Sequence, residues 1–215
     1  PMTRSVADAA ILLDVIAGSD DNDPATAEAD AKRVSYRAAL EQASFRGRRI
    51  GIVRSIGGND DRGRPILETV IATLRAQGAE VIDPVELPHA GEYDANESTV
   101  LAYEFKADLE SYLHGRDIAS LATLADVIAF NEREAARELR WFGQELMREA
   151  QAKGSLDAAE YRTALQRAKR LSGPEGIDAA LKKYRLDALV ALTQSPAWSI
   201  DLVNGDGWRS GFSSS

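Results

Sequence analysis

The stretch RIGIVR at residues 49–54 is followed by RPILETVIATLRAQG at residues 64–78 and by AEVI at residues 79–82. The first piece is a short apolar run typical of a buried strand, and the second repeats apolar residues at helical spacing. Gly78 is placed to end that helix, and the third piece begins another strand. A strand, a helix and a strand in this order predict two parallel strands joined by a right-handed crossover, and hence an α/β fold.

Two polar loops have the composition of ligand sites but lack the residues that would hold a ligand. Gly57, Gly58 and Asn59 follow the first strand, where nucleotide-binding folds hold a phosphate, yet neither GxGxxG nor GxxxxGK followed by Ser or Thr fits. Residues 19–24 are rich in Asp and Asn, but a calcium loop counted from Asp20 needs a glycine and a glutamate that are both missing. We interpret both loops as turns and expect no metal and no cofactor.

Helices dominate the sequence after residue 93. Residues 98–113 predict an amphipathic helix whose apolar stripe faces a core, and four large side chains form this stripe: Leu101, Phe105, Leu109 and Tyr112. Apolar residues recur at helical spacing again over residues 123–152 and 157–171. Glutamate pairs four positions apart, such as Glu145 and Glu149, are flanked by arginines. We therefore interpret them as solvated helix faces rather than as metal ligands or an acid and base pair.

The end of the sequence returns to strand and loop. Pro174 suits the first position of a helix, and an apolar run at residues 188–192 then predicts a strand. Residues 195–215 show little periodicity, and a loop of this length in a compact domain is usually functional or incomplete. We expect a single partial domain in three segments, namely an α/β module at 1–92, a helical segment at 93–173, and a helix, strand and pocket loop at 174–215.

Composition narrows the classes of function. The 215 residues carry a formal net charge of −8, which argues against nucleic acid as a partner, and the absence of cysteine excludes disulfides and a thiolate nucleophile. The most apolar stretch, residues 7–17, is far shorter than the roughly 20 residues that cross a bilayer, so we expect no membrane span. The sequence opens on Pro1 without a signal-peptide pattern. We interpret that start as a cut and expect a cytoplasmic protein.

Several stretches resemble one family of enzymes. PMTRSVADAA at residues 1–10 resembles the block that follows the catalytic loop in the amidase signature family of serine hydrolases. Residues 48–53 are similar to the family's next strand, VLAYEFKADLESYL at 100–113 to its helical segment, and residues 195–215 to the loop that leads into GGSSSPAAVAGYP. FNERE, which begins at Phe130, and WFGQELM, which begins at Trp141, are similar to patterns of the peptide-amidase-like branch.

This resemblance implies an α/β fold in which a mixed sheet is covered by helices on both sides, with a helix-rich insertion. It also implies hydrolysis of a carbon-nitrogen amide bond by a triad of a nucleophilic serine, a bridging serine in a cis peptide and a lysine, assisted by an oxyanion-binding loop. In the family these residues precede the PMTRS block, so we expect no catalytic residue in this chain. The expected partners are an amide-bearing small molecule or peptide and a missing N-terminal portion of the same enzyme.

Four residues of the C-terminal loop are candidates for the substrate pocket, because the family's pocket is partly lined there. They are Trp198, Asp201, Asn204 and Trp208. Aromatic and amide side chains hold a peptide-like ligand by stacking and by paired hydrogen bonds, although Trp198 suits equally well a place beneath its own loop.

Other residues that invite a catalytic interpretation fit a structural one. The serines at 213–215 match the family's downstream GGSSSP element rather than its nucleophile. His89 and His114 are isolated, and the GxSxG elbow of an α/β-hydrolase is absent, so we interpret both histidines as surface residues.

Three hypotheses of function remain. The first is the C-terminal part of an amidase, inactive by itself and, with its buried strands lacking neighbours, poorly soluble, aggregated or partly folded. The second is a non-catalytic binding or regulatory protein that has kept the amidase scaffold. The third, a free-standing helical interaction module, leaves the strand, helix and strand at residues 49–82 unexplained.

Overall fold

The computed structural model of the chain describes residues 2–55, 61–116, 120–193 and 197–205. Ten α-helices, three strands, one 3₁₀ turn and one π-helical turn are formed by these residues. In chain order they are α1 (Val6–Ile16), the 3₁₀ turn (Pro24–Thr26), α2 (Ala29–Lys32), α3 (Tyr36–Glu41), β1 (Arg49–Ile52), α4 (Arg64–Ala76), β2 (Glu80–Ile82), α5 (Asp94–His114), α6 (Leu124–Arg133), α7 (Ala135–Glu138), α8 (Glu145–Gln151), α9 (Ala159–Ser172), the π-helical turn (Gly173–Ile177), α10 (Asp178–Tyr184) and β3 (Ala188–Val190).

The sheet has the strand order β2-β1-β3, and all three strands are parallel. Ile50 pairs with Val81 of β2 on one side and with Ala188 of β3 on the other. The strand, helix and strand predicted at residues 49–82 are therefore present, and the predicted α/β class is confirmed. The described strands are those of a parallel sheet.

Helix α4 covers one face of this sheet because its apolar residues recur on one side. Leu67, Ile71 and Leu74 of α4 form a buried cluster with Ile50 and Ile52 of β1. Gly78 follows the helix with φ 88°, a left-handed conformation that favours glycine, and lets the chain turn into β2.

The opposite face of β1 is tightly packed at a glycine. A Cβ atom added to Gly51 would lie 2.5 Å from Leu186 Cδ1, 2.9 Å from Val85 Cγ2 and 3.0 Å from Leu189 Cδ2. Val53, which lies on the same face of the strand, is fully buried. The absence of a side chain at residue 51 lets these apolar groups approach the backbone of β1.

Helices α1 and α3 pack on each other and are joined by polar groups. The Ser5 hydroxyl caps the start of α1 by accepting a hydrogen bond from the Asp8 amide. The Asp14 carboxylate on α1 accepts from the Tyr36 amide at 2.6 Å and so satisfies the first turn of α3. Much of α1 remains uncovered in the described structure, since Val6 and Val15 are 71% and 74% exposed.

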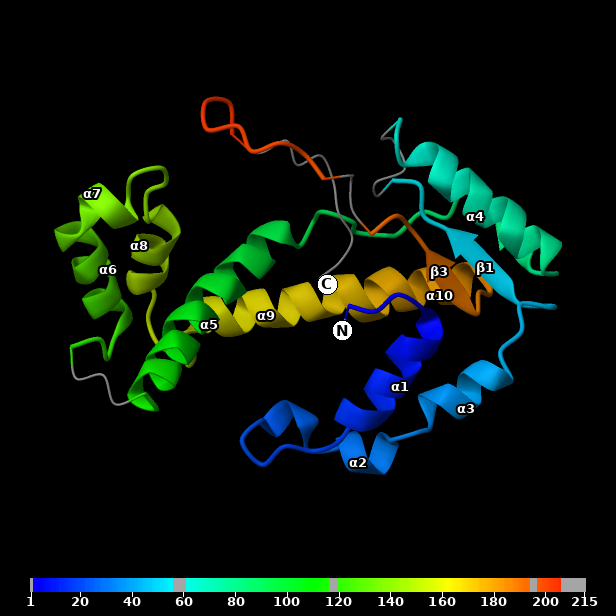
Figure 1. Cartoon of the computed structure of the whole chain (residues 1–215), viewed down its shortest axis with the longest axis horizontal. Helices are drawn as coiled ribbons and strands as arrows, with labels where there is room; N and C mark the ends of the chain where they lie inside the picture. Colours follow the sequence, from blue (N-terminus) through cyan, green and yellow to red (C-terminus); the bar gives the residue numbers. More distant parts are fainter. Residues whose placement is uncertain (1, 56–60, 117–119, 194–196, 206–215) are drawn as a thin grey trace.

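Helices α5 and α9 lie side by side and form the middle of a long helical arm (Figure 1). Tyr103 and Tyr161 contact each other with ring centroids 5.5 Å apart. The Tyr103 hydroxyl donates to Glu160 Oε2 at 2.7 Å, and the Tyr161 hydroxyl donates to Glu104 Oε1 at 2.6 Å. This reciprocal exchange fixes the two helices against each other.

The helical pattern at residues 123–152 is divided into α6, α7 and α8. Thr123 and Asp126 form a capping box that begins α6. Gln144 is buried before α8, where its Nε2 donates to the Ile128 carbonyl of α6 at 3.2 Å and its Oε1 accepts from Asn131 Nδ2 at 3.1 Å. The side-chain amide therefore ties α8 to α6 across the turn that separates them.

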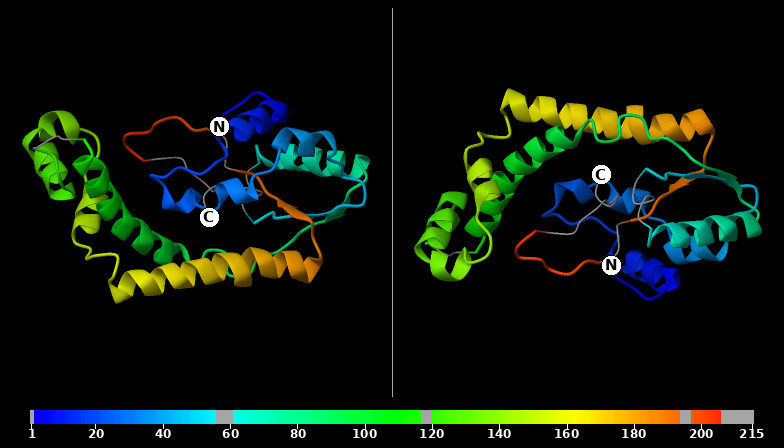
Figure 2. Two further views of the ribbon diagram at one scale, coloured as in Figure 1. Left: turned by 90° about the horizontal axis from the view of Figure 1, so that it is seen from below. Right: turned by 90° about the horizontal axis from the view of Figure 1, so that it is seen from above.

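The arm curves around a concave space. Figure 2 shows α5, α8 and α9 as an arc, with the loop at residues 197–205 on its inner side. Helices α9 and α10 are continuous through the π-helical turn, so Pro174 does not begin a separate helix as the sequence predicts. Among the described residues no helix is long and apolar enough to cross a membrane.

Candidate functional site

Polar side chains gather at the carboxyl edge of the sheet, where open α/β folds place their ligands. Arg54 follows β1 and Asp83 follows β2. Arg54 Nε donates to Asp83 Oδ1 and Arg54 Nη2 donates to Asp83 Oδ2, both at 2.6 Å. The third guanidinium nitrogen, Nη1, donates to Glu68 Oε1 on α4 at 2.7 Å. One side chain thus joins the ends of two strands to the first half of a helix.

This ion cluster is partly screened from water. The Asp83 side chain is only 12% exposed, whereas Glu68 is half exposed. The hydrogen bonds that Arg54 donates to Asp83, and then the one that it donates to Glu68, raise the pKa of Arg54 further above its ordinary value. Because each guanidinium nitrogen is already engaged, we assign Arg54 a positioning role at the edge rather than contact with a ligand.

The loop after β3 contains three of the four predicted pocket residues within the described structure. Asp201 Oδ1 accepts from the amides of Val203 and Asn204, both at 2.9 Å, and Oδ2 accepts from Asn204 Nδ2 at 2.8 Å. Trp198 is half-buried, and the other predicted residue, Trp208, lies outside the described residues. The structure thus brings Asp201 and Asn204 into direct contact.

These contacts change the interpretation of Asp201. Hydrogen bonds from the Asn204 amide, the Asn204 side chain and the Val203 amide hold the pKa of Asp201 below its ordinary value. The carboxylate therefore stays ionised and shapes its own turn. Val203 is 90% exposed and Ile200 83% exposed, so this turn presents apolar side chains to the space around it.

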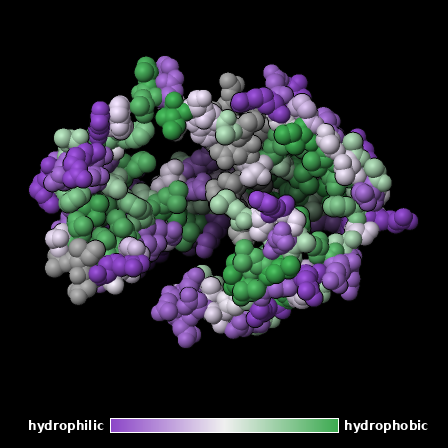
Figure 3. Space-filling view, viewed as in Figure 1, coloured by the Kyte–Doolittle hydropathy of each residue, from purple (hydrophilic) through white to green (hydrophobic). Residues whose placement is uncertain are grey.

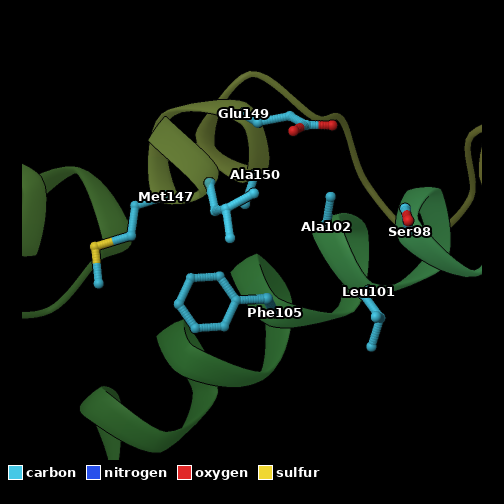
Figure 4. A pocket seen from close by; sticks show the side chains of 8 residues that line it. Ser98, Leu101, Ala102, Phe105, Met147, Glu149 and Ala150 are labelled. Carbon is cyan, nitrogen blue, oxygen red and sulfur yellow. The ribbon is translucent and has the colours of Figure 1, made fainter. Parts of the chain in front are cut away.

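A cavity of about 550 Å³ lies between α5 and α8 (Figure 4). Its lining is mainly apolar and consists of Ser98, Leu101, Ala102, Phe105, Leu146, Met147, Glu149 and Ala150. Figure 4 shows the ring of Phe105 extending from α5 toward Met147 on α8, with Glu149 at the end nearer Ser98. The size falls within the range of small-molecule sites, which is about 300 to 1,000 Å³.

The apolar face of α5 differs from the sequence prediction. The helix is present, but Leu101 is 60%, Phe105 40% and Tyr112 56% exposed. The residues that α5 buries are Val100 and Tyr103, which pack on α9. Periodicity identifies an apolar face correctly but does not distinguish a face that packs in a core from one that lines a cavity.

Both histidines of the chain are engaged in local contacts. His89 Nδ1 lies 3.0 Å from Glu92 Oε2, and His114 Nδ1 lies 2.6 Å from the Glu110 carbonyl. Within the described ranges no cluster of three or more His, Asp or Glu could hold a metal ion. The glycines at 57 and 58, the Asn at 59 and the serines at 213–215 lie outside the described residues.

Comparison with known proteins identifies the family. Residues 1–203 match the family Amidase. The chain belongs to the amidase family. A probable amidase of Arabidopsis thaliana is 36% identical over 199 residues, which are 89% of this chain and 37% of that protein. A glutamyl-tRNA(Gln) amidotransferase subunit from Roseobacter denitrificans is 40% identical over 91 residues, which are 41% of this chain and 18% of that protein.

Solved amidase structures match the fold over nearly the whole chain. Peptide amidase PAM, in complex with the competitive inhibitor chymostatin, superposes with a TM-score of 0.91 and 46% identity over 99% of this chain and 43% of that one. The native peptide amidase of Stenotrophomonas maltophilia gives a TM-score of 0.84 and 48% identity over 92% of this chain and 40% of that one. The amidase resemblance and its fold class are therefore confirmed. The chain spans less than half the length of these amidases.

Sequence reasoning missed two parts of the candidate site in this amidase chain. Arg54 and Asp83 each follow a strand, and polar residues at the carboxyl ends of neighbouring parallel strands are a signal that could have paired them. The cavity between α5 and α8 has no comparable signal, because its shape depends on where α8 packs.

Proposed function

We propose that this chain is part of an enzyme that hydrolyses carbon-nitrogen amide bonds, with C-terminal peptide amides as the substrate class. The observation that carries the proposal is the superposition on peptide amidase PAM over 99% of the chain at 46% identity. Water would be added across the amide bond, so that a carboxylic acid and ammonia leave. Family membership supports the hydrolysis of an amide bond, and the likeness to peptide amidase supports C-terminal peptide amides as the substrates.

The bond-breaking residues in this proposal lie outside the chain. A serine nucleophile needs a neighbouring base, and the family uses a second serine and a lysine for this purpose. Two serine hydroxyls of the described residues illustrate another use, since Ser19 donates to the Asp30 carboxylate at 2.5 Å and Ser98 donates to the Asp94 carbonyl at 2.9 Å. This supports a scaffold role for these residues.

The chain would contribute the wall of the substrate site. We propose that Trp198, Asn204 and Trp208 contact the substrate and that Asp201 acts with them by holding the loop in shape. Support comes from the position of this loop after β3, at the edge of the sheet where α/β folds bind ligands, and on the inner side of the helical arc (Figure 2).

Ammonia release provides the test. The product of the complete reading frame that contains this chain would be given a C-terminal peptide amide, and ammonia would be measured against the same peptide as the free acid. We expect release that depends on protein concentration. A folded product that binds the peptide amide without releasing ammonia would contradict the proposal and favour the non-catalytic binding protein.

Two matched variants test the loop in the same assay. Asn204→Ala is expected to raise KM for the peptide amide, because the amide side chain is lost from the site. Asn22→Ala is the control, since Asn22 Nδ2 donates to Asp20 within its own turn at 3.3 Å, as Asn204 Nδ2 does to Asp201. An equal KM for both variants would remove Asn204 from the proposed site.

A further inference from the structure

The cavity between α5 and α8 combines an apolar interior with one ionisable side chain. Leu101, Phe105 and Leu146 are 60%, 40% and 79% exposed and have no covering element among the described residues. The Ser98 hydroxyl donates to the Asp94 carbonyl of its own helix at 2.9 Å, so it is already satisfied. The Glu149 carboxylate is therefore the polar group left to act on a ligand.

The exposed side chain of Glu149 has no side-chain partner within the described residues. The adjacent Arg148 pairs with Glu132 at 2.7 Å, and the nearby Lys153 pairs with Glu160 at 3.1 Å. Figure 4 shows the Glu149 carboxylate turned toward the Ser98 end of the cavity. An unpaired anion beside an apolar hollow favours a ligand that joins a positive charge to an apolar group.

The walls of the cavity are held in place by contacts behind them. Lys106 Nζ donates to the carbonyls of Gln151 at 3.1 Å and Lys153 at 2.9 Å, and so ties the end of α8 to α5. Gln144 fixes the other end of α8 to α6. Ala150, on the inner side of α8, is almost fully buried. A site supported in this way loses little freedom when a ligand binds.

The arm and the C-terminal loop border the same hollow. Figure 3 shows hydrophobic side chains on the α5–α8 arm and on the loop, with the molecule hollowed between them. The loop contributes Ile200, Leu202 and Val203, all of them exposed. A substrate held by the loop would therefore have apolar surface on both sides.

We propose that this cavity binds the apolar side chain of the amide substrate while Glu149 binds its free ammonium group. The inference rests on the proposed amidase function and narrows the substrate to the amides of apolar amino acids and of the shortest peptides, in which a free ammonium group lies within one residue of the cleaved bond. The side chain lies among Leu101, Phe105 and Met147, and the ammonium lies at the Glu149 end.

Binding can be read independently of turnover, because Met147 lines the cavity and Met2, the other methionine of this chain, does not. The complete gene product would be labelled with methyl-¹³C methionine, and the Met147 and Met2 signals identified by their loss in Met147→Leu and Met2→Leu. L-Phenylalaninamide is expected to shift the Met147 signal and to leave that of Met2 unmoved. Glycinamide, which has no side chain, is expected to shift neither.

The charge is tested with a blocked probe and a matched variant. N-acetyl-L-phenylalaninamide is expected to bind about fivefold more weakly than L-phenylalaninamide, the scale of a partly exposed ion pair. Glu149→Gln is expected to abolish this preference, and Glu138→Gln, at an exposed glutamate of α7, to preserve it. Equal affinity for the two probes, an unchanged preference in Glu149→Gln, or a Met147 signal that no probe moves would overturn the inference.

The Met147 signal and the probe affinities test the cavity separately from catalysis. A protein that releases ammonia from amides but leaves Met147 unmoved would retain the proposed function and lose the cavity as its subsite. A Met147 shift without ammonia release would retain the cavity and contradict the amidase function.

Discussion

Arg54 connects three elements through one guanidinium, so its replacement is expected to lower the stability of the fold. Arg54→Met keeps much of the side-chain volume but leaves Asp83, which is 12% exposed, without its cation. We expect the free energy of unfolding of the complete gene product to fall by about 2 kcal/mol in urea titration. Arg75→Met, at an exposed arginine near the end of α4, is the control and should change it by less than about 0.5 kcal/mol. Equal effects would contradict the role assigned to Arg54.

Tyr161 makes a contribution to stability that is lost at alkaline pH. The hydrogen bond to Glu104 raises the pKa of Tyr161 from 10.0 to about 12. Because the folded pKa is raised, this contribution is complete below pH 10 and is lost as pH rises toward 12. Tyr161→Phe is expected to lower the free energy of unfolding by about 1 to 2 kcal/mol at pH 8, with a smaller loss at pH 11.

The control for Tyr161 is Tyr36→Phe, which removes a hydroxyl from a partly exposed tyrosine on α3. Urea unfolding of the complete gene product, unaltered and with either substitution, at the two pH values separates the hydrogen bond from the general effect of alkali. A loss for Tyr161→Phe that stays constant from pH 8 to pH 11 would contradict the stated cause.

At the scale of elements, the π-helical turn between α9 and α10 depends on a glycine. A Cβ atom added to Gly176 would lie 2.4 Å from the Leu171 carbonyl oxygen, which is backbone and cannot move aside cheaply. Gly176→Ala is therefore expected to lower the free energy of unfolding by about 1 to 3 kcal/mol. Gly154→Ala, where no atom lies within 4 Å of an added Cβ, is the matched control.

This prediction is checked by urea or thermal unfolding of the complete gene product with either glycine substitution. Alanine has a higher helix propensity than glycine, which by itself would stabilise the helical position 176. A Gly176→Ala variant as stable as the Gly154→Ala variant would therefore show that the turn relaxes without cost.

Some elements are predictable from local pattern and others are set by distant contacts. Leu67, Ile71 and Leu74 predict α4 because the face they share is the face that is buried. Leu101 and Phe105 predict α5 equally well, but whether their face meets a core depends on α8, which lies about forty residues along the sequence. The π-helical turn is likewise set by packing around Gly176. The helix start predicted at Pro174 is therefore wrong, because the chain continues from α9 into α10 there.

The candidate site shows the same division. The C-terminal loop is predicted as part of the site from a family resemblance, and its inner contact between Asp201 and Asn204 follows a local side-chain pattern. The bidentate pair of Arg54 and Asp83 joins residues 29 positions apart, so the signal for it in the sequence is their shared place after two neighbouring strands rather than a local spacing. Contacts of this kind arise only when parallel strands are aligned.

At the scale of the whole molecule, the described surface exposes apolar groups that soluble monomers usually cover. Val6, Val15 and Ile16 of α1 are 71%, 74% and 58% exposed, and β2 and β3 are the edges of the sheet that the described residues form. We expect the 215-residue chain by itself to self-associate or to fold only partly, as measured by light scattering after size-exclusion chromatography. A monodisperse monomer with a sharp cooperative unfolding transition would contradict this.

We propose that these residues supply an amidase scaffold while the atoms that break the amide bond come from elsewhere. The decisive measurement is ammonia release from a C-terminal peptide amide by the purified 215-residue chain, assayed beside the complete gene product. We expect release by the complete product and none by the chain. Release by the chain that is abolished when one of its own serines is replaced would contradict the claim.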